Sequence, residues 1–120
     1  MLAPTNRLRK PAQINRVYKR GAYGSAAGLF SLKAATSNEL NSRAVVVVGK
    51  KVDKRAVVRN RQRRRLAAVL REAWGTVPGG YDIVITVHTL LNEVSSADLR
   101  LHLNQAMERA KVIKPQRTTK

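Results

Sequence analysis

The residues best suited to bind another molecule crowd into one short stretch of the chain. Between positions 50 and 65, nine of sixteen residues are lysine or arginine, and only Asp53 is acidic. Arginine donates paired hydrogen bonds to phosphate and stacks on nucleobases, and the side-chain amide of asparagine can add a neutral hydrogen bond. The predicted nucleic-acid contacts are Lys50, Lys51, Lys54, Arg55, Arg59, Asn60, Arg61, Arg63, Arg64 and Arg65.

The charge of the whole chain supports this interpretation. Lysine and arginine number 24 against 7 aspartate and glutamate residues, which gives a formal net charge of +17. Self-repulsion of this size destabilises a compact state, so we expect a polyanionic partner to neutralise it. A charged stretch is often only a solvated surface. The density and the arginine bias here favour nucleic acid, and an anionic membrane surface is the second candidate.

Outside the basic stretch, few residues offer chemistry of their own. The chain has no cysteine, and its two histidines, His88 and His102, lack the further ligands that a zinc site needs. The seven acidic residues are scattered, and no glycine-rich phosphate loop of the P-loop type is present. We therefore predict no catalytic residue and no metal ligand in this chain.

Four apolar or aromatic residues have two possible roles. Ile14, Tyr18, Phe30 and Leu32 fit the periodicity of a protein core, which is the better explanation on spacing alone. Tyr18 and Phe30 also lie near basic residues, and exposed rings there would form a stacking surface for single-stranded bases. The spacing leaves both interpretations open.

Apolar periodicity and capping residues predict the elements that must position these side chains. Pro11 suits the first position of a helix that Gly21 would end, and Ser95 with Asp98 resembles a capping box. The predicted order is helix, strands, helix, strand, helix, which is typical of one α/β layer domain. The predicted helices cover 11–20, 56–74 and 96–110, and the predicted strands cover 29–35, 44–48 and 83–87.

The helix predicted over 56–74 explains why valines are mixed with the arginines. Val58, Leu66 and Leu70 recur at the spacing of one helical face and belong to the core pattern. Asn60, Arg61, Arg64 and Arg65 point broadly the other way, and Arg59 and Arg63 flank the apolar stripe. The stretch therefore predicts a folded helix with one packed face and one face for a polyanion.

Length and composition set the domain organisation. A chain of 120 residues with 43% hydrophobic residues is expected to form a single domain over 1–120, with a basic N-terminal arm at 1–10 and a flexible basic tail at 112–120. No apolar stretch has the length of a signal peptide or a membrane span. We therefore expect a cytoplasmic protein without a membrane partner.

The basic stretch also resembles a known family. The sequence GKKVDKRAVVRNR at 49–61 resembles the protein subunit of bacterial ribonuclease P, in which a lysine pair at a strand end precedes Ala-Val-x-Arg-Asn-Arg at the start of a helix. Weaker matches are NRLRK at 6–10, VYKRG at 17–21 and GGYDIV at 79–84. The resemblance covers nearly the whole domain.

The resemblance implies a fold. That fold is α+β, a single-domain α/β sandwich of the ribosomal protein S5 domain 2-like type, with about four strands and three helices. It includes a left-handed β-α-β crossover, against the right-handed norm. Strand 44–48, helix 56–74 and strand 82–87 would form the crossover.

The resemblance also implies a function. The chain would be the protein subunit of ribonuclease P, one copy per RNA, and would help to remove the 5′ leader from precursor tRNA. The catalytic site and its magnesium ions would belong to the RNA subunit. By position, the residues that contact the catalytic RNA would be Arg59, Asn60, Arg61, Arg63 and Arg64. The residues that line a cleft for the leader would be Ile14, Tyr18, Phe30 and Leu32.

Two other functions fit the same charge and size. A small ribosomal or other structural RNA-binding protein would bind ribosomal RNA and leave cleavage of precursor tRNA unchanged. A nucleoid-type protein would prefer duplex DNA and form dimers. Stimulation of leader removal by a ribonuclease P RNA would distinguish the three.

Overall fold

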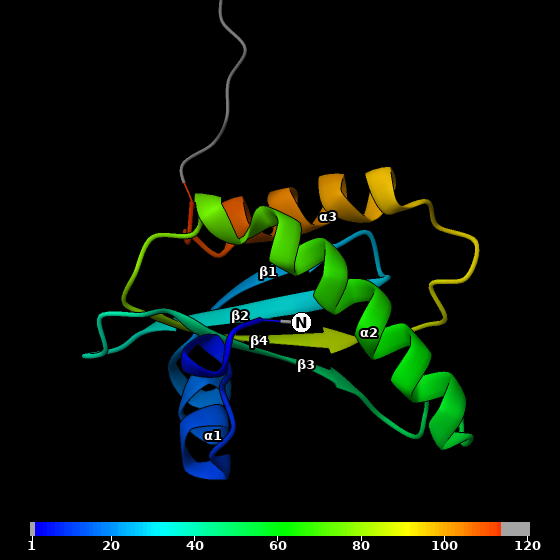
Figure 1. Cartoon of the computed structure of the whole chain (residues 1–120), viewed down its shortest axis with the longest axis horizontal. Helices are drawn as coiled ribbons and strands as arrows, with labels where there is room; N and C mark the ends of the chain where they lie inside the picture. Colours follow the sequence, from blue (N-terminus) through cyan, green and yellow to red (C-terminus); the bar gives the residue numbers. More distant parts are fainter. Residues whose placement is uncertain (1, 114–120) are drawn as a thin grey trace, which may run out of the picture.

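The strongest strand patterns of the sequence pair with each other in one mixed sheet. In the computed structural model, which describes residues 2–113, β3 (Arg43–Val48) runs parallel to β4 (Tyr81–Val87). β2 (Phe30–Thr36) pairs antiparallel with β4, and β1 (Ala22–Ala26) pairs antiparallel with β2. The strand order is therefore β1-β2-β4-β3 (Figure 1).

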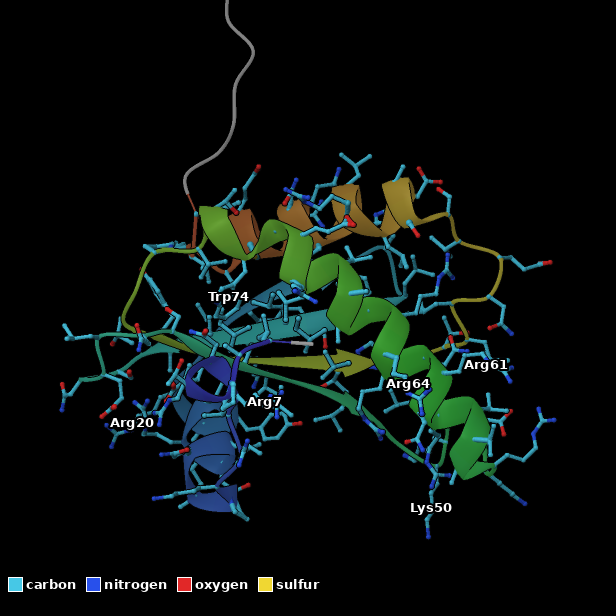
Figure 2. All side chains as sticks on the ribbon, in the orientation of Figure 1. Arg7, Arg20, Lys50, Arg61, Arg64 and Trp74 are labelled. Atoms are coloured by element: carbon cyan, nitrogen blue, oxygen red, sulfur yellow. The ribbon has the colours of Figure 1, made fainter. Side chains whose placement is uncertain are left out.

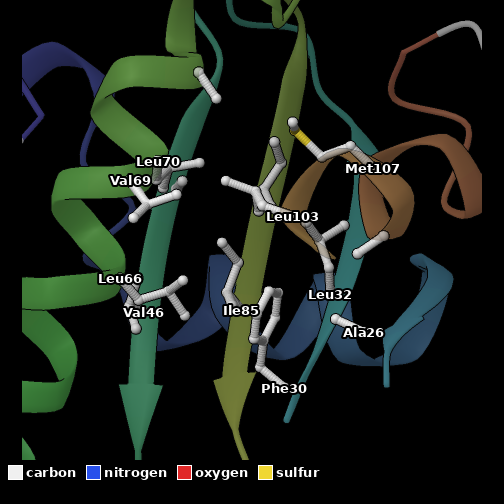
Figure 3. Packing of buried hydrophobic residues seen from close by; sticks show 14 of the residues in the cluster. Ala26, Phe30, Leu32, Val46, Leu66, Val69, Leu70, Ile85, Leu103 and Met107 are labelled. Carbon is white, nitrogen blue, oxygen red and sulfur yellow. The ribbon is translucent and has the colours of Figure 1, made fainter. Parts of the chain in front are cut away.

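Three α-helices cover the two faces of this sheet. α1 (Pro11–Arg20) packs on one face, while α2 (Ala56–Ala73) and α3 (Ser96–Arg109) pack on the other (Figures 1 and 3). Short 3-10 helices cover Pro4–Asn6 and Trp74–Thr76. The predicted helix starts are confirmed, because Pro11 begins α1 and the backbone N–H of Asp98 donates to Ser95 Oγ over 3.1 Å.

The connection from β3 through α2 to β4 has the uncommon hand. The two strands are parallel neighbours, and α2 lies on the face that α3 also covers. In Figure 3, α2 and α3 lie in front of the sheet, the arrows of both strands point downward, and β4 lies to the right of β3. With the strands turned to point upward, β4 therefore lies to the left of β3. The crossover is therefore left-handed, as the resemblance implied.

The main core fills the space between the sheet, α2 and α3 (Figure 3). Alternate residues of each strand point into it, and leucines of the two helices meet them. A smaller cluster around Val17 and Val84 fixes α1 to the opposite face. The large buried side chains of the main core include Phe30, Leu32, Leu66, Leu70, Ile83, Ile85, Leu103 and Met107.

Strand β1 was not predicted from the sequence. Its residues, AYGSA, have low strand propensity, and pairing with β2 holds them in place. Gly24 lets α3 approach closely, because a Cβ there would lie 2.1 Å from the carbonyl oxygen of Ala106. Ala27 and Gly28, both at positive φ, make the tight turn between the two strands.

Both ends of the described chain are packed rather than loose. The basic arm runs along the edge of β3, where Leu8 N donates to the carbonyl of Ala44, and Leu2 and Leu8 are buried. The flexible tail was predicted from 112, but Val112 is buried in the main core, so that boundary is wrong. Residues 114–120 of the predicted tail lie outside the described residues. No helix among residues 2–113 is both long and apolar enough to cross a membrane.

Candidate nucleic-acid interface

The exposed basic side chains of the basic stretch lie in the loop before α2 and on the first half of α2. Lys50, Arg61 and Arg64 are exposed together at this end of the molecule (Figure 2). Within residues 2–113, the side chains of Arg61 and Arg64 make no hydrogen bond and no ion pair. Two arginines without internal partners can bind an external anion without first breaking an internal bond.

Two neighbouring arginines hold the start of α2 instead. The guanidinium of Arg55 donates to both carboxylate oxygens of Asp53 at 3.0 Å, and Arg55 N also donates to Asp53 Oδ1. Arg59 donates to the carbonyls of Asp53 and Lys54. The hydrogen bonds from Arg55 lower the pKa of Asp53 from 3.8 to about 2. This ion pair is exposed, and it organises the loop that leads into α2.

Arg65 does not belong to the exposed surface. It was predicted among the RNA contacts, but its guanidinium donates to the carbonyls of Leu91 and Val94. Next to it, the buried Gln62 accepts a hydrogen bond from Leu91 N and donates to Asn92 Oδ1, each over 2.8 Å. The two side chains tie the loop after β4 to α2. The predicted orientation of Arg65 is therefore wrong.

The remaining predicted contacts stay on or near the surface. Arg63 is half-buried and donates to the side-chain oxygen of Asn60, one turn earlier on α2. Lys51 and Lys54 are exposed in the loop before the helix. These residues thus lie beside Arg61 and Arg64 at the same end of α2.

A second candidate surface is the sheet face under α1, which we call the open face and define by Tyr23, Ser31, Lys33, Val45, Val47 and Thr86. Tyr18 of α1 borders it with 39% of its surface exposed, and its Oη lies 3.4 Å from Thr86 Oγ1. Lys33 Nζ donates to the carbonyl of Tyr18 over 2.8 Å. Ile14 is half-buried against the small cluster under α1.

Phe30 and Leu32 do not reach this surface. Both side chains are 0% exposed in the main core, on the side of α2 and α3 (Figure 3). The predicted position of these two residues in a cleft beside α1 is therefore wrong. Side chains alternate along a strand, so the neighbours Ser31 and Lys33 face the side of α1 instead.

Sequence reasoning missed Ser31, Tyr23 and Thr86 as candidates for this face, whereas Lys33 was among the basic residues expected near the stacking surface. The polar alternation of Ser31 and Lys33 with apolar neighbours was a usable signal, because a sheet face left partly open carries polar residues. Tyr23 lies opposite Lys33 in the register, but it belongs to the strand that was not predicted.

A buried carboxylate anchors α1 beside the open face. Asp82, 0% exposed, accepts two hydrogen bonds from Arg43 at 2.9 and 2.8 Å and one from Arg16 at 3.0 Å. The hydrogen bond from Arg43 to Asp82 raises the pKa of Arg43. Arg16 and Arg43 are therefore structural, although they contribute to the same positive charge.

Ligand side chains for a metal ion do not gather in the described part of the chain. Among residues 2–113, no three histidine, cysteine, aspartate or glutamate side chains lie together. The carboxylates of Asp53 and Asp82 already bind arginines.

Sequence comparisons point to one family. The family model described as Ribonuclease P matches residues 2–111. The ribonuclease P protein component of Pseudanabaena sp. (strain PCC 6903) is 36% identical to this chain over 118 residues, which is 94% of this chain and 97% of the relative.

Solved structures share the fold. The RNase P protein of Staphylococcus aureus matches with a TM-score of 0.75 at 22% identity, over 91% of this chain and 98% of that one. The RNase P protein of Thermotoga maritima matches with a TM-score of 0.74 at 25% identity, over 86% of this chain and 96% of that one. Because the family model and the relative both span nearly the whole sequence, this chain belongs to the ribonuclease P protein component family.

Proposed function

We propose that this chain binds the catalytic RNA of ribonuclease P through the exposed end of α2, and the 5′ leader of precursor tRNA on the open face. One protein would serve one RNA, and the product would be tRNA with a mature 5′ end. The reaction would take place in the cytoplasm, where a bacterium makes precursor tRNA.

The observation that supports this proposal is that some arginines of the basic stretch have hydrogen-bond partners within the protein and others do not. Arg55, Arg59 and Arg65 bond to the protein itself, whereas Arg61 and Arg64 have no partner within residues 2–113. Unpaired guanidinium groups on a rigid helix suit the fixed phosphates of a folded RNA. Each neutralised phosphate releases counterions, so binding should weaken steeply as salt is added.

Binding of the leader is supported by the chemistry of the open face. Tyr18 and Tyr23 expose 39% and 56% of their surfaces, and Lys33 lies opposite Tyr23 in the register. Aromatic rings with a nearby cation bind single-stranded nucleic acid with little sequence preference. A leader that varies between precursor tRNAs needs that kind of surface.

We assign the reacting groups and the magnesium ions to the RNA subunit. Magnesium prefers several oxygen ligands in octahedral geometry, and the carboxylates of Asp53 and Asp82 already bind arginines. The contribution of the protein would be electrostatic. Its positive charge screens repulsion between RNA phosphates, so the RNA would hold its magnesium ions at lower concentration.

Reconstitution tests the proposal. The chain is added to the ribonuclease P RNA of its own organism, and removal of the 5′ leader is measured at low magnesium concentration. We expect cleavage that the RNA alone does not achieve at that concentration. A rate equal to that of the RNA alone would contradict the proposal and favour a structural RNA-binding protein.

Charge reversal identifies the surface. Arg61→Glu with Arg64→Glu should weaken binding to the catalytic RNA about 100-fold at low salt and reduce the salt slope by about 2. Arg71→Glu with Lys111→Glu is the matched control, because it changes the net charge equally at the other end of α2 and after α3. Equal losses in the two double variants would mean that overall charge, and not this surface, drives binding.

A further inference from the structure

A groove lies beside α2, at the edge of β3, and Val45 is the one residue that it shares with the residues that define the open face. It has a volume of about 660 Å³, which falls within the range of pockets that hold small ligands. Its floor is apolar and comes from β3 and from Leu8 of the N-terminal segment. Its rim carries the arginines Arg7, Arg9, Arg63 and Arg64, and no lining residue is acidic.

The N-terminal segment forms one wall of the groove. Leu8 N donates to the carbonyl of Ala44 over 3.0 Å, and Asn6 Nδ2 donates to the carbonyl of Ser42 over 2.9 Å. Arg7 uses only Nε within the described chain, in a bond to the carbonyl of Leu2. The wall is thus held in place by hydrogen bonds to the backbone carbonyls of Ser42 and Ala44, and the terminal nitrogens of Arg7 stay available.

The opposite wall is one face of α2. Asn60, Arg63, Arg64 and Ala67 follow the spacing at which helical side chains share a face. Figure 2 labels Arg7 and Arg64, which come from the two walls. At Ala67 the helix presents only a methyl group, and this leaves space between the guanidinium groups and the apolar floor.

We propose that this groove binds one unpaired nucleotide of the ribonuclease P RNA, with its base on the apolar floor and its flanking phosphates on the arginine rim. An apolar floor suits the faces of a nucleobase, and an arginine rim without acids suits phosphate. A purely apolar ligand would leave the rim unused, and an inorganic anion would leave the floor unused.

The geometry favours the RNA subunit, and not the leader of precursor tRNA, as the source of the bound nucleotide. The inference rests on the proposed function, because Asn60, Arg63 and Arg64 belong both to the groove and to the proposed RNA-binding end of α2. The groove therefore continues the surface that binds the catalytic RNA. The tyrosines proposed to bind the leader, Tyr18 and Tyr23, do not line it.

Filling the groove tests the inference. Ala67→Leu places a larger side chain on its wall without removing a charge, and Ala68→Leu is the matched control because Ala68 is the exposed neighbour outside the groove. We expect Ala67→Leu to weaken binding to the ribonuclease P RNA about tenfold, while Ala68→Leu binds like the unmodified protein. Binding is measured by filter retention of labelled RNA.

Chemical probing locates the nucleotide. A base-modifying reagent is applied to the RNA alone and to its complexes with the unmodified protein and with each variant. One unpaired nucleotide should be protected by the unmodified protein and by Ala68→Leu, but stay reactive with Ala67→Leu. Equal affinities and identical protection patterns for the two leucine variants would overturn the inference. So would a protected nucleotide found only in labelled precursor tRNA.

A rim variant separates loss of the site from loss of the fold. Arg9 is exposed on the N-terminal segment, so Arg9→Gln should leave the thermal unfolding midpoint unchanged and still restore reactivity at the same nucleotide. Unchanged protection with Arg9→Gln, together with a lowered unfolding midpoint for Ala67→Leu, would also overturn the inference. If the unmodified protein does not bind the RNA, the proposed function fails. If it binds the RNA, but the groove variants change neither the affinity nor the protection of the nucleotide, only the groove proposal fails.

Discussion

The same strands make both faces of the sheet, but one face is buried in the main core and the other is partly exposed. On the face under α2 and α3, Phe30, Leu32, Ile83 and Ile85 have no exposed surface. On the open face, α1 covers only part of the sheet, and residues such as Lys33 remain half-exposed. Along β2, Lys33 thus lies on a surface that can bind a ligand, while its neighbours Leu32 and Ala34 lie in the main core.

The difference shows how a small domain can carry a large positive charge. The face under α2 and α3, which we call the closed face, supplies most of the apolar burial. Burial of apolar surface is the main stabilising term in folding. The open face then needs few apolar contacts, because Asp82 fixes α1 through Arg16 and supports Arg43. Its other polar and aromatic residues can therefore serve binding.

The largest expected effect belongs to the closed face. Phe30→Ala should lower the free energy of unfolding by about 3–5 kcal/mol, because it removes a fully buried ring and leaves a cavity. Urea denaturation followed by circular dichroism measures the change. Lys33→Ala, three positions along the same strand, should stay within about 0.5 kcal/mol of the unmodified protein. Similar losses for both variants would contradict the division between the faces.

This division could be predicted only in part. The alternation of Phe30 and Leu32 with Ser31 and Lys33 gives two sides of a strand, but it does not tell which helix covers which side. That choice depends on the register of β2 against β4, in which Phe30 lies opposite Val87 of the main core. The aromatic ring was therefore assigned to the wrong face, whereas β3, β4 and α2 were placed correctly from their apolar patterns.

The candidate RNA surface could also be predicted only in part, because local sequence places some of its side chains and distant contacts place others. The positions of Arg61 and Arg64 follow from helical periodicity, which local sequence determines. The position of Arg65 does not, because its partners are carbonyls at Leu91 and Val94, far along the chain. β1 was missed because its sequence is poor in strand-forming residues, and pairing with β2 overrides that propensity.

The second prediction concerns the anchor of α1. Asp82→Asn keeps the shape of the side chain but removes the charge that Arg16 and Arg43 share. We expect a loss of about 2–3 kcal/mol in the free energy of unfolding, below the value for a fully buried pair because both arginines are partly exposed.

Asp98→Asn is the control for Asp82→Asn. Asp98 is an exposed acid in the first turn of α3, where its interaction with the helix dipole is worth about 0.3–1 kcal/mol. Both variants are measured by urea denaturation. An equal loss for the two would show that Asp82 does not anchor α1 more strongly than an ordinary surface acid.

The third prediction concerns binding on the open face. Tyr18→Ala should weaken binding of precursor tRNA to the holoenzyme about tenfold, because one stacked base is lost. Binding of tRNA without a leader should be unchanged, and so should the unfolding midpoint. Leu101→Ala is the control, because Leu101 is an exposed apolar residue on α3, on the other side of the sheet. If Tyr18→Ala weakens both RNAs equally, Tyr18 does not contact the leader.

The smallest effect concerns the loop that leads into α2, where an exposed ion pair organises the chain. The bonds from Arg55 hold the pKa of Asp53 at about 2 instead of 3.8. Because the folded pKa is lowered, this contribution to stability is present above the ordinary pKa and is lost as the pH falls through about 2. Lowering the pH from 7 to 5 should therefore leave this ion pair intact.

The titration of Asp53 can be followed through its side-chain carbon signal by nuclear magnetic resonance. Arg55→Gln should move the midpoint up towards 3.8, since the guanidinium makes the largest contribution and the backbone N–H of residue 55 remains. A midpoint that stays near 2 in this variant would assign the shift to the backbone N–H. Asp53 would then act as a cap for the first turn of α2, and Arg55 would be available for RNA together with Arg61 and Arg64.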